Sequence, residues 1–358
     1  MYKYVSRRLL QAIPIFFGIT LLSYALMVLA PGNPVARITF NPRMRVEERE
    51  AIAAQLGVYD PLPLQYLRWL LGDDWMRWDA DGDGVSDHSF IIPLDANGDG
   101  EPEPPGVNRG ILRGDFGNSF VGRRPVLEVI ADRLPATVEL AVAAFLTSLV
   151  VGTLLGVLAA VRRGGLFDNF SRLVAVFFNA VPDFWLGLIL ILILGSQMRL
   201  LPMGSQCAPS LTGECPPIWE RLQFLLLPTL VLAAPPIASY SRFMRASMLE
   251  TLGKDYVRTA QAKGLANRAV WVQHGARNAL IPLASLIGQE FTVLLGGAVV
   301  VETIFSWPGI GRLSVNAVLQ QDYPIVMGVV ILSSVASILG FILTDILYAL
   351  IDPRIRFK

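Results

Sequence analysis

Charged side chains are scarce in this sequence, and that scarcity excludes the largest class of proteins. Asp, Glu, Lys and Arg supply 16% of the 358 residues, whereas soluble globular domains carry roughly a quarter. Hydrophobic residues supply 53%, and the mean hydropathy is +0.50. The composition therefore predicts an all-α polytopic membrane protein rather than a soluble globule.

Motifs for catalysis are also absent. The sequence contains no GxxxxGK[ST] string that would cradle nucleotide phosphates, no HExxH and no GxSxG. The two histidines, His88 and His274, are expected on opposite sides of the membrane. We therefore expect a protein that is not an enzyme, and any energy for uphill transport must enter through a partner.

Six apolar runs are long enough to cross a hydrocarbon core, which takes about 20 helical residues. They lie at 9–30, 136–161, 173–197, 222–240, 281–301 and 325–351. The first run is longer than the apolar region of a signal peptide and has no clear cleavage site, so we expect a retained helix. The chain then divides into a first helix (1–30), a large external segment (31–135), helices two to six (136–351) and a tail (352–358).

The positions of Lys and Arg predict the orientation, because basic residues resist translocation. They gather before the first run, in the second-to-third connection, at 241–278 and in the tail, whereas the short connections on the other face carry only Arg199, Arg221 and Arg312. We expect both termini to be cytoplasmic. The long segment after the first helix is exported in spite of its charge.

The polar and basic loop at 241–278 has the pattern of a docking element. Residues 255–265 read as one helix, with Gly264 where a helix needs a left-handed stop. Asn267 is expected to cap a second helix that runs through His274. A helix, a glycine and a second helix indicate a surface that holds a cytoplasmic partner.

The two cysteines, Cys207 and Cys215, both fall in the outward connection between the third and fourth runs. An oxidising exterior permits a disulfide there, and we expect one. Two unpaired thiols are the alternative, since the distance that a disulfide requires is not visible in a sequence.

An acidic, glycine-rich insertion occupies 72–113 and contains two similar phrases, DADGDGVSD from Asp79 and DANGDGEPE from Asp95. Oxygen ligands at loop positions 1, 3, 5 and 9, with glycine at position 6, wrap a Ca²⁺ ion. The candidate ligands are Asp79, Asp81, Asp83 and Asp87 in the first phrase, and Asp95, Asn97, Asp99 and Glu103 in the second.

A complete EF-hand is excluded, because Phe90 and Gly106 stand where its glutamate would be. The phrases are closer to the short DxDxDG calcium loops of exported domains. A merely solvated acidic loop is the alternative, since runs of charge usually face solvent.

Two acidic residues within the apolar runs are candidates for the pore. Asp183 would lie about ten residues, or roughly 15 Å, into the third run, and Glu290 lies in the fifth. The alternative for Asp183 is a bond to backbone that Pro182 leaves unpaired, and for Glu290 a hydrogen bond between helices.

At 241–278 the sequence closely resembles the cytoplasmic coupling loop of bacterial dipeptide/oligopeptide ABC importer permeases, through DYVRTAQAKGL from Asp255 to Leu265. Further resemblances run along the chain: GDFGNS from Gly114, RLPAT from Arg133, PDFWLG from Pro182, ETIFSWPGIG from Glu302, DYP from Asp322 and DPRI from Asp352. Arg258 departs from the family pattern, and the 72–113 insertion is not part of it.

The resemblance implies a type I ABC importer permease fold with six helices, in a bacterial or archaeal plasma membrane. It implies three kinds of protein partner beside the lipid bilayer: a second, similar permease, two ATPases that bind ATP and Mg²⁺, and an external solute-binding protein. Trp307-Pro308-Gly309 could touch the binding protein or form a rigid turn. Nucleic acid is not expected. The residues implied in ATPase coupling are Leu252, Asp255, Tyr256, Arg258, Thr259, Ala260, Lys263, Gly264 and Leu265.

The implied cargo is di- or oligopeptides, although permeases of this class also serve nickel, opines and oligosaccharides. Two other functions are less consistent with the sequence. A secondary transporter would not require the basic helix-glycine-helix loop, and a calcium-dependent surface anchor would leave six helices without a purpose.

Overall fold

The computed structural model describes residues 2–29, 57, 60–95, 100, 102, 104–208, 215–280, 283 and 298–351, and the structural statements below concern these residues. The chain forms two compact units. Unit 1 comprises Met1–Ala12, Arg133–Leu313 and Ser333–Lys358, and unit 2 comprises Ile13–Asp132 and Ser314–Leu332. Each unit is considered by itself.

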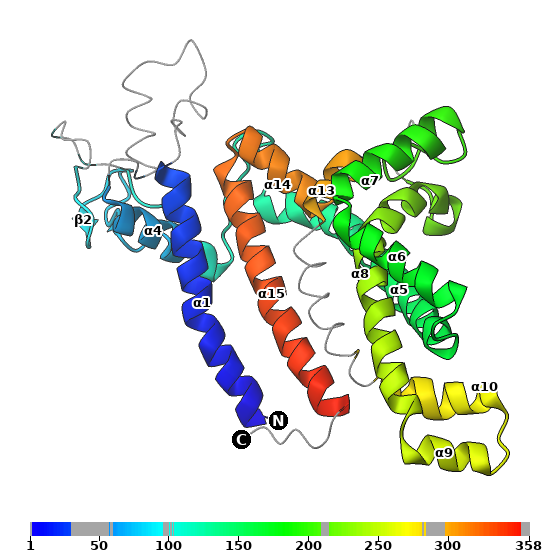
Figure 1. Ribbon diagram of the computed structural model, residues 1–358. Helices are drawn as coiled ribbons and strands as arrows, with labels where there is room; N and C mark the ends of the chain where they lie inside the picture. Colours follow the sequence, from blue (N-terminus) through cyan, green and yellow to red (C-terminus); the bar gives the residue numbers. More distant parts are fainter. Residues whose placement is uncertain are drawn as a thin grey trace. The chain divides into compact units, whose positions relative to one another are not determined.

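Long apolar helices dominate the described chain, as the composition predicts (Figure 1). Four are long and apolar enough to cross a membrane: α1 (Tyr2–Leu29), α5 (Val126–Val161), α8 (Leu222–Leu252) and α15 (Tyr323–Ile351). The protein is an all-α polytopic membrane protein. The run at 281–301 lies almost wholly outside the described residues, apart from the start of α13 (Val299–Ile304).

The third apolar run, 173–197, does not form one unbroken helix. Residues 166–197 form α6 (Leu166–Ala180), α7 (Asp183–Leu190) and a π-helical continuation η2 (Ile191–Gln197), with a bend of 104° between α6 and the α7–η2 stretch. Pro182 has no backbone N–H, and proline disfavours a helical conformation in the residue before it. Val181 is accordingly extended, with φ −81° and ψ 125°.

The fourth span is longer than its apolar run. The sequence predicts a helix that ends near residue 240, but α8 continues to Leu252 and contains Pro228, Pro235 and Pro236. Its final third is polar, so composition alone placed the loop too early. The first twelve residues of the segment 241–278 are therefore helix rather than loop.

In unit 1, α5 and α8 pack with their backbones in close approach. A Cβ added to Gly152 would lie 2.7 Å from the Cβ of Tyr240, and one added to Gly156 would lie 2.6 Å from the Cβ of Met244. Glycine on one helix is what lets a second helix come this near. The main core of the unit joins α5, α7, α8 and α13 around Leu140, Leu227, Val231, Phe305 and Trp307.

In unit 2, the short helix α4 (Leu62–Leu71) packs on α1 through aromatic side chains. Tyr66 lies edge-on to Tyr24, with ring centroids 5.7 Å apart, and its hydroxyl is 2.8 Å from that of Thr20. Buried Arg68 binds Asp60 at 2.6 Å and Asp73 at 3.0 Å. The amphipathic sequence at 65–71 predicts a short helix, which is present within α4. A second short helix, which the sequence predicts at 45–55, lies outside the described residues.

The acidic insertion contributes a minimal sheet to unit 2. Strand β1 (Arg77–Trp78) pairs antiparallel with β2 (His88–Ser89), with Arg77 opposite Ser89 and Trp78 opposite His88. A 3₁₀ turn, η1 (Ile111–Arg113), forms the end of the insertion. Helix α14 (Ile310–Leu319), which follows the Trp-Pro-Gly turn, is an element that the apolar runs did not predict.

Candidate functional site

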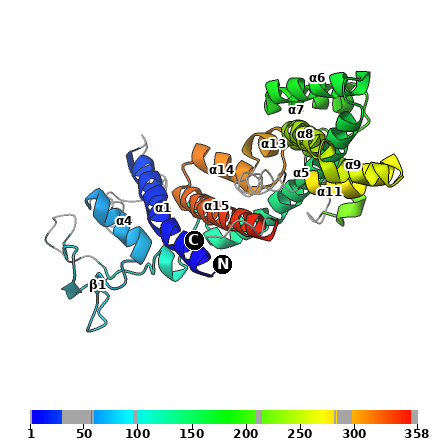
Figure 2. The same ribbon diagram turned by 60° about the horizontal axis from the view of Figure 1, so that its bottom comes forward.

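A helical hairpin at the C-terminal end of α8 is the candidate site (Figures 1 and 2). Its first arm is α9 (Asp255–Ala262), and its second arm is the continuous stretch of α10 (Asn267–Ala269), the π-helix η4 (Val270–Ala276) and α11 (Arg277–Ala279). We call residues 255–279 the hairpin. Gly264 connects the arms with φ +77°, as the predicted left-handed stop requires.

Two details of the predicted hairpin are wrong. The first helix ends at Ala262 rather than Leu265, because the chain turns at Gly264, whose N–H donates to the Gln261 carbonyl at 2.9 Å. Asn267 is the first helical residue rather than the cap; Ala266 precedes it, and no side chain caps this terminus.

The two arms are held together by a small apolar core. Val257 and Ala260 of α9 are buried against Val270 of the second arm, and Leu252 covers them from the end of α8. Ala260, which the resemblance includes among the coupling residues, is therefore 6% exposed and packs inside the hairpin. Its small size allows the arms to approach.

The second arm fastens the hairpin to α8. A Cβ added to Gly275 would lie 2.5 Å from the Cε of Met248, so the backbone of the arm rests directly on that side chain. The Ser247 hydroxyl donates to the Ala279 carbonyl at 3.0 Å. Displacement of the hairpin would therefore act directly on α8.

The opposite face of the hairpin is open to solvent. Except for Ala260 and the half-buried Leu252, the predicted coupling residues are exposed: Asp255, Tyr256, Arg258, Thr259, Lys263, Gly264 and Leu265. Tyr256 and Leu265 expose 42% and 44% of their surfaces. Arg258 lies 3.7 Å from Asp255 with its side chain 73% exposed. Tyr256 and Leu265, surrounded by exposed charged side chains, form a surface suited to a protein partner.

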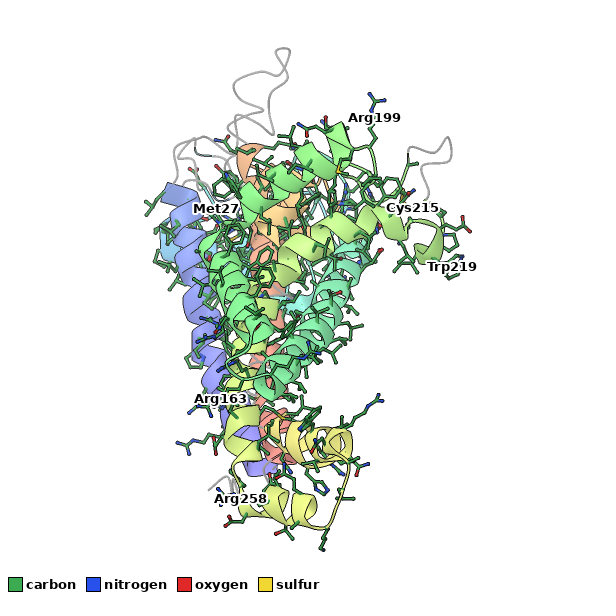
Figure 3. The ribbon with its side chains drawn as sticks, turned by 45° about the vertical axis from the view of Figure 1, so that its right-hand side comes forward. Met27, Arg163, Arg199, Cys215, Trp219 and Arg258 are labelled. Carbon is green, nitrogen blue, oxygen red and sulfur yellow. A yellow bond between two sulfur atoms is a disulfide. The ribbon has the colours of Figure 1, made fainter. Side chains whose placement is uncertain are left out.

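Figure 3 relates this surface to the rest of unit 1. Arg163 and Arg258 lie toward one end of the unit, whereas Arg199, Cys215 and Trp219 lie toward the other. The basic hairpin and the two-cysteine connection are thus at opposite ends of the long helices.

The pore candidates are only partly described. Asp183 is the first residue of α7, directly after the bend, and not a residue in the middle of a span. Its half-buried carboxylate has no hydrogen-bond partner within the described part of the chain, so the alternative role, a bond to backbone near Pro182, is not seen. Glu290 lies outside the described residues.

The first acidic phrase folds into a tight loop. One carboxylate oxygen from each of Asp79, Asp81 and Asp87 lies within 4.8 Å of the others, while Asp83 instead accepts the Val85 N–H at 2.8 Å. Asp79 accepts the N–H groups of Gly82 and Gly84, which hold the pKa of its carboxyl below the usual range.

The pKa of Asp81 is raised in spite of the N–H that Asp83 donates to it, because the carboxylates of Asp83, Asp87 and Asp79 surround it. In the second phrase, Asp95 accepts the Gly100 N–H at 2.8 Å, just as Asp79 accepts that of Gly84 in the first. Its other candidate ligands, Asn97, Asp99 and Glu103, lie outside the described residues.

Cys207 and Cys215 are joined by a disulfide, with their Cα atoms 5.7 Å apart. Residues on both sides of this bridge bind the same carboxylate of α5. Gln206 donates to Glu139 at 2.8 Å, and Arg221 lies 2.8 Å from Glu139. The connection is therefore fastened to α5 by polar contacts in addition to its covalent bridge.

The structure also brings together motifs that the sequence analysis left as separate strings. The fully buried Glu302 accepts the Thr137 hydroxyl at 2.9 Å and the Arg312 N–H at 2.9 Å. The Ile310 N–H donates to the Thr137 oxygen at 2.7 Å, so that hydroxyl has its one hydrogen left for Glu302. The buried Glu302 carboxylate thereby accepts a backbone N–H from the first turn of α14, where a helix favours negative charge.

Trp307 packs beside these residues, and its burial favours the rigid turn over a contact of this side chain with an external partner. Its side chain is fully buried, and its indole N–H donates to the Ala136 carbonyl at 2.8 Å. In unit 2, the Asp322 carboxylate accepts the Ser119 hydroxyl at 2.5 Å and the Phe120 N–H at 3.1 Å. In the sequence, the members of the Thr137–Glu302 and Ser119–Asp322 pairs appear only as polar residues within separate motifs. Such motifs indicate that the residues matter but not which residues they contact.

Comparison with known proteins gives matches over the whole chain. The family model described as the binding-protein-dependent transport system inner membrane component matches residues 152–357, and the model of its N-terminal part matches residues 1–77. The chain is 36% identical over 358 residues to the oligopeptide transport system permease protein AppB of Bacillus subtilis, covering all of both chains.

Two further relatives are also covered completely. The chain is 34% identical over 376 aligned positions to the dipeptide transport system permease protein DppB of Escherichia coli K12. It is 34% identical over 373 positions to the di/tripeptide transport system permease protein DppB of Pseudomonas aeruginosa. The similarity thus extends over the described hairpin and both units.

Proposed function

Since the chain belongs to the family of binding-protein-dependent transport system inner membrane components, we propose that it is the permease subunit of an ATP-driven importer for short peptides. It catalyses no reaction itself and forms half of the translocation pore. The peptide cargo follows from the names of relatives that match it from end to end.

The hairpin is the observation that carries the proposal. Its apolar core and its contacts with Met248 and Ser247 hold it firmly on α8, while its outer face exposes Tyr256, Leu265 and Arg258. We assign this face to a cytoplasmic ATPase. Movement of the ATPases would then act on α8 as a rigid body, which is a usual form of switching between pore states.

The complete assembly would contain a second permease, two ATPases and an external binding protein, in the plasma (inner) membrane. Both termini would be cytoplasmic. The separation of Arg163 and Arg258 from Cys215 in Figure 3 supports this orientation, because cytoplasmic ends carry the excess of arginine and disulfides belong to oxidising compartments.

Purification of the detergent-solubilised complex tests the central assignment. We expect ATPase subunits to remain with the wild-type chain, and Leu265→Asp to lose them because it adds a charge to the docking face. Leu200→Asp is the matched control, since Leu200 is an exposed leucine beside Arg199 at the other end of unit 1. A wild-type complex without any ATPase would refute the proposal.

We also propose that the loop at 79–87 binds Ca²⁺ in a structural role. The 4.8 Å cluster of Asp79, Asp81 and Asp87 supports this assignment. Extracellular calcium modules have dissociation constants of roughly 10⁻⁴–10⁻³ M. Millimolar Ca²⁺, but not Mg²⁺, should protect the insertion of the full-length chain from proteolysis, and Asp79→Asn should abolish the protection. The same cleavage pattern with and without Ca²⁺ would favour a solvated acidic loop.

A further inference from the structure

A buried ion pair joins α6 to the part of α8 that carries the hairpin. Asp168 lies in the first turn of α6. Its two carboxylate oxygens accept hydrogen bonds from Nε and Nη2 of Arg245, at 2.5 and 2.7 Å. The Asp168 side chain is 1% exposed and that of Arg245 is 20% exposed. The Gly164 N–H, from the turn before α6, donates to the same carboxylate at 2.9 Å.

The geometry accounts for the burial of this charge. Two parallel N–H···O bonds from one guanidinium are the strongest arrangement that arginine makes with a carboxylate. The start of α6 adds a favourable field for a negative group. Arg172, one turn further along α6, lies 3.8 Å from the same carboxylate with its side chain 54% exposed, so Arg245 is the partner that comes from another helix. A carboxylate this enclosed would be costly without it, so the position of α6 depends on the position of Arg245.

Arg245 stands seven residues before the end of α8, roughly 10 Å at the rise of an α-helix. Between Arg245 and that end, Ser247 and Met248 make the contacts that fasten the second arm of the hairpin. The hairpin and the ion pair therefore act on the same two turns of α8.

The contact of α8 with α5 is of a different kind. At this level the two helices meet by apolar packing: a Cβ added to Gly156 would lie 2.6 Å from the Cβ of Met244, and Ala160 packs with Met244 and Met248 in one cluster. Two charge-assisted hydrogen bonds, in contrast, fix both distance and direction. The ion pair is thus a directional attachment of α8 to α6, close to the hairpin.

Helix α6 leads directly to the 104° bend and to Asp183 at the start of α7. We propose that Asp168 and Arg245 are a positioning pair that transfers displacement of the hairpin from α8 to α6 and so to this bend. The inference rests on the proposed docking of an ATPase on the hairpin. It assigns no contact with cargo to either residue.

The assembled transporter, reconstituted in liposomes, provides the test. Three quantities are measured: the amount of complex, ATP hydrolysis, and peptide uptake per ATP hydrolysed. Asp168→Asn should lower uptake per ATP about tenfold, the size of an ordinary coupling between sites. Asp168→Glu, which keeps a carboxylate in the first turn of α6, should retain more of the wild-type ratio than Asp168→Asn.

Arg245→Lys is the second variant, needed if Asp168→Asn lowers assembly. It keeps the charge but loses the two-pronged geometry, so uptake per ATP should fall while the complex still forms. Arg124→Lys is the matched control, because Arg124 binds Asp132 at 2.9 Å with both side chains more than half exposed in unit 2. It should keep the wild-type ratio.

The outcomes separate the two proposals. A wild-type complex that lacks ATPase subunits refutes the proposed function itself. A normal wild-type complex whose Asp168→Asn or Arg245→Lys variant keeps the wild-type uptake per ATP overturns the positioning pair alone. A lower amount of complex with an unchanged ratio also overturns it, because that result describes a purely structural contact.

Discussion

At the scale of single residues, backbone conformation and buried hydrogen bonds give the sharpest expectations. Gly264 has φ +77°, and a Cβ built there would meet nothing within 4 Å. Space is therefore not the constraint at this position. The left-handed conformation is, and it costs an ordinary L-residue roughly 1–2 kcal/mol.

We expect Gly264→Val to misplace the end of α9 and to uncouple ATP hydrolysis from uptake. Gly264→Asn adds a side chain of similar volume, but asparagine tolerates the left-handed region, so it should keep most of the uptake. Transport and hydrolysis are measured on the same preparations. Unchanged uptake in the valine variant would contradict the role given to this turn.

The buried Glu302 provides a second expectation at this scale. Thr137→Val leaves the Ile310 N–H and one Glu302 oxygen without their partner, so it should lower stability by about 1–3 kcal/mol. Thr229→Val is the control, because the buried Thr229 hydroxyl has no hydrogen-bond partner within the described residues. The midpoint of thermal unfolding in detergent checks both. Equal effects of the two substitutions would show that the Glu302 contact contributes nothing.

At the scale of elements, α9 has one face buried in the hairpin core and one face exposed to solvent. Val257 is fully buried in the hairpin core, whereas the neighbouring Arg258 has its side chain 73% exposed. The burial follows from the helical spacing of Val257 and Ala260, three residues apart.

We expect substitutions at Val257 and Arg258 to affect different properties of the protein. Val257→Asn buries an amide without partners, at a cost of about 1–3 kcal/mol, and should speed hydrogen exchange of the α9 amides. Arg258→Ala should leave that exchange unchanged but weaken retention of the ATPase. Exchange mass spectrometry and co-purification distinguish the effects. Faster exchange in Arg258→Ala would contradict the division into faces.

Prediction of elements from the sequence succeeded where the signal is local. The apolar runs indicate α1, α5, α8 and α15, and the glycine indicates the turn of the hairpin. It failed where hydropathy gives no boundary: α8 continues for twelve residues of mixed polarity beyond its apolar run, since packing against α5, α6 and the hairpin's second arm stabilises that helix. Hydropathy also does not register the bend at Pro182, because residues on both sides are apolar.

At the scale of the whole molecule, the proposed orientation makes an accessibility prediction. In intact cells, a membrane-impermeant thiol reagent should label Cys207 and Cys215 after mild reduction, because the proposed orientation places them outside. A cysteine placed by Arg163→Cys or Arg258→Cys in a Cys207→Ser, Cys215→Ser background should react only after permeabilisation. Arg199→Cys in that background is the positive control for the outer face. Labelling of position 258 in intact cells would reverse the topology.

The sequence by itself determined the class of the molecule and some of its local structure. It indicated a membrane protein of long helices, a left-handed turn at Gly264 and a set of motifs along the chain. These follow from composition and from the conformations that single residues allow. Only the tertiary structure decided which motifs meet, as Thr137 meets Glu302 and Asp168 meets Arg245. Such contacts join residues 77 to 165 positions apart, and their formation depends on how helices pack rather than on any periodicity within either segment.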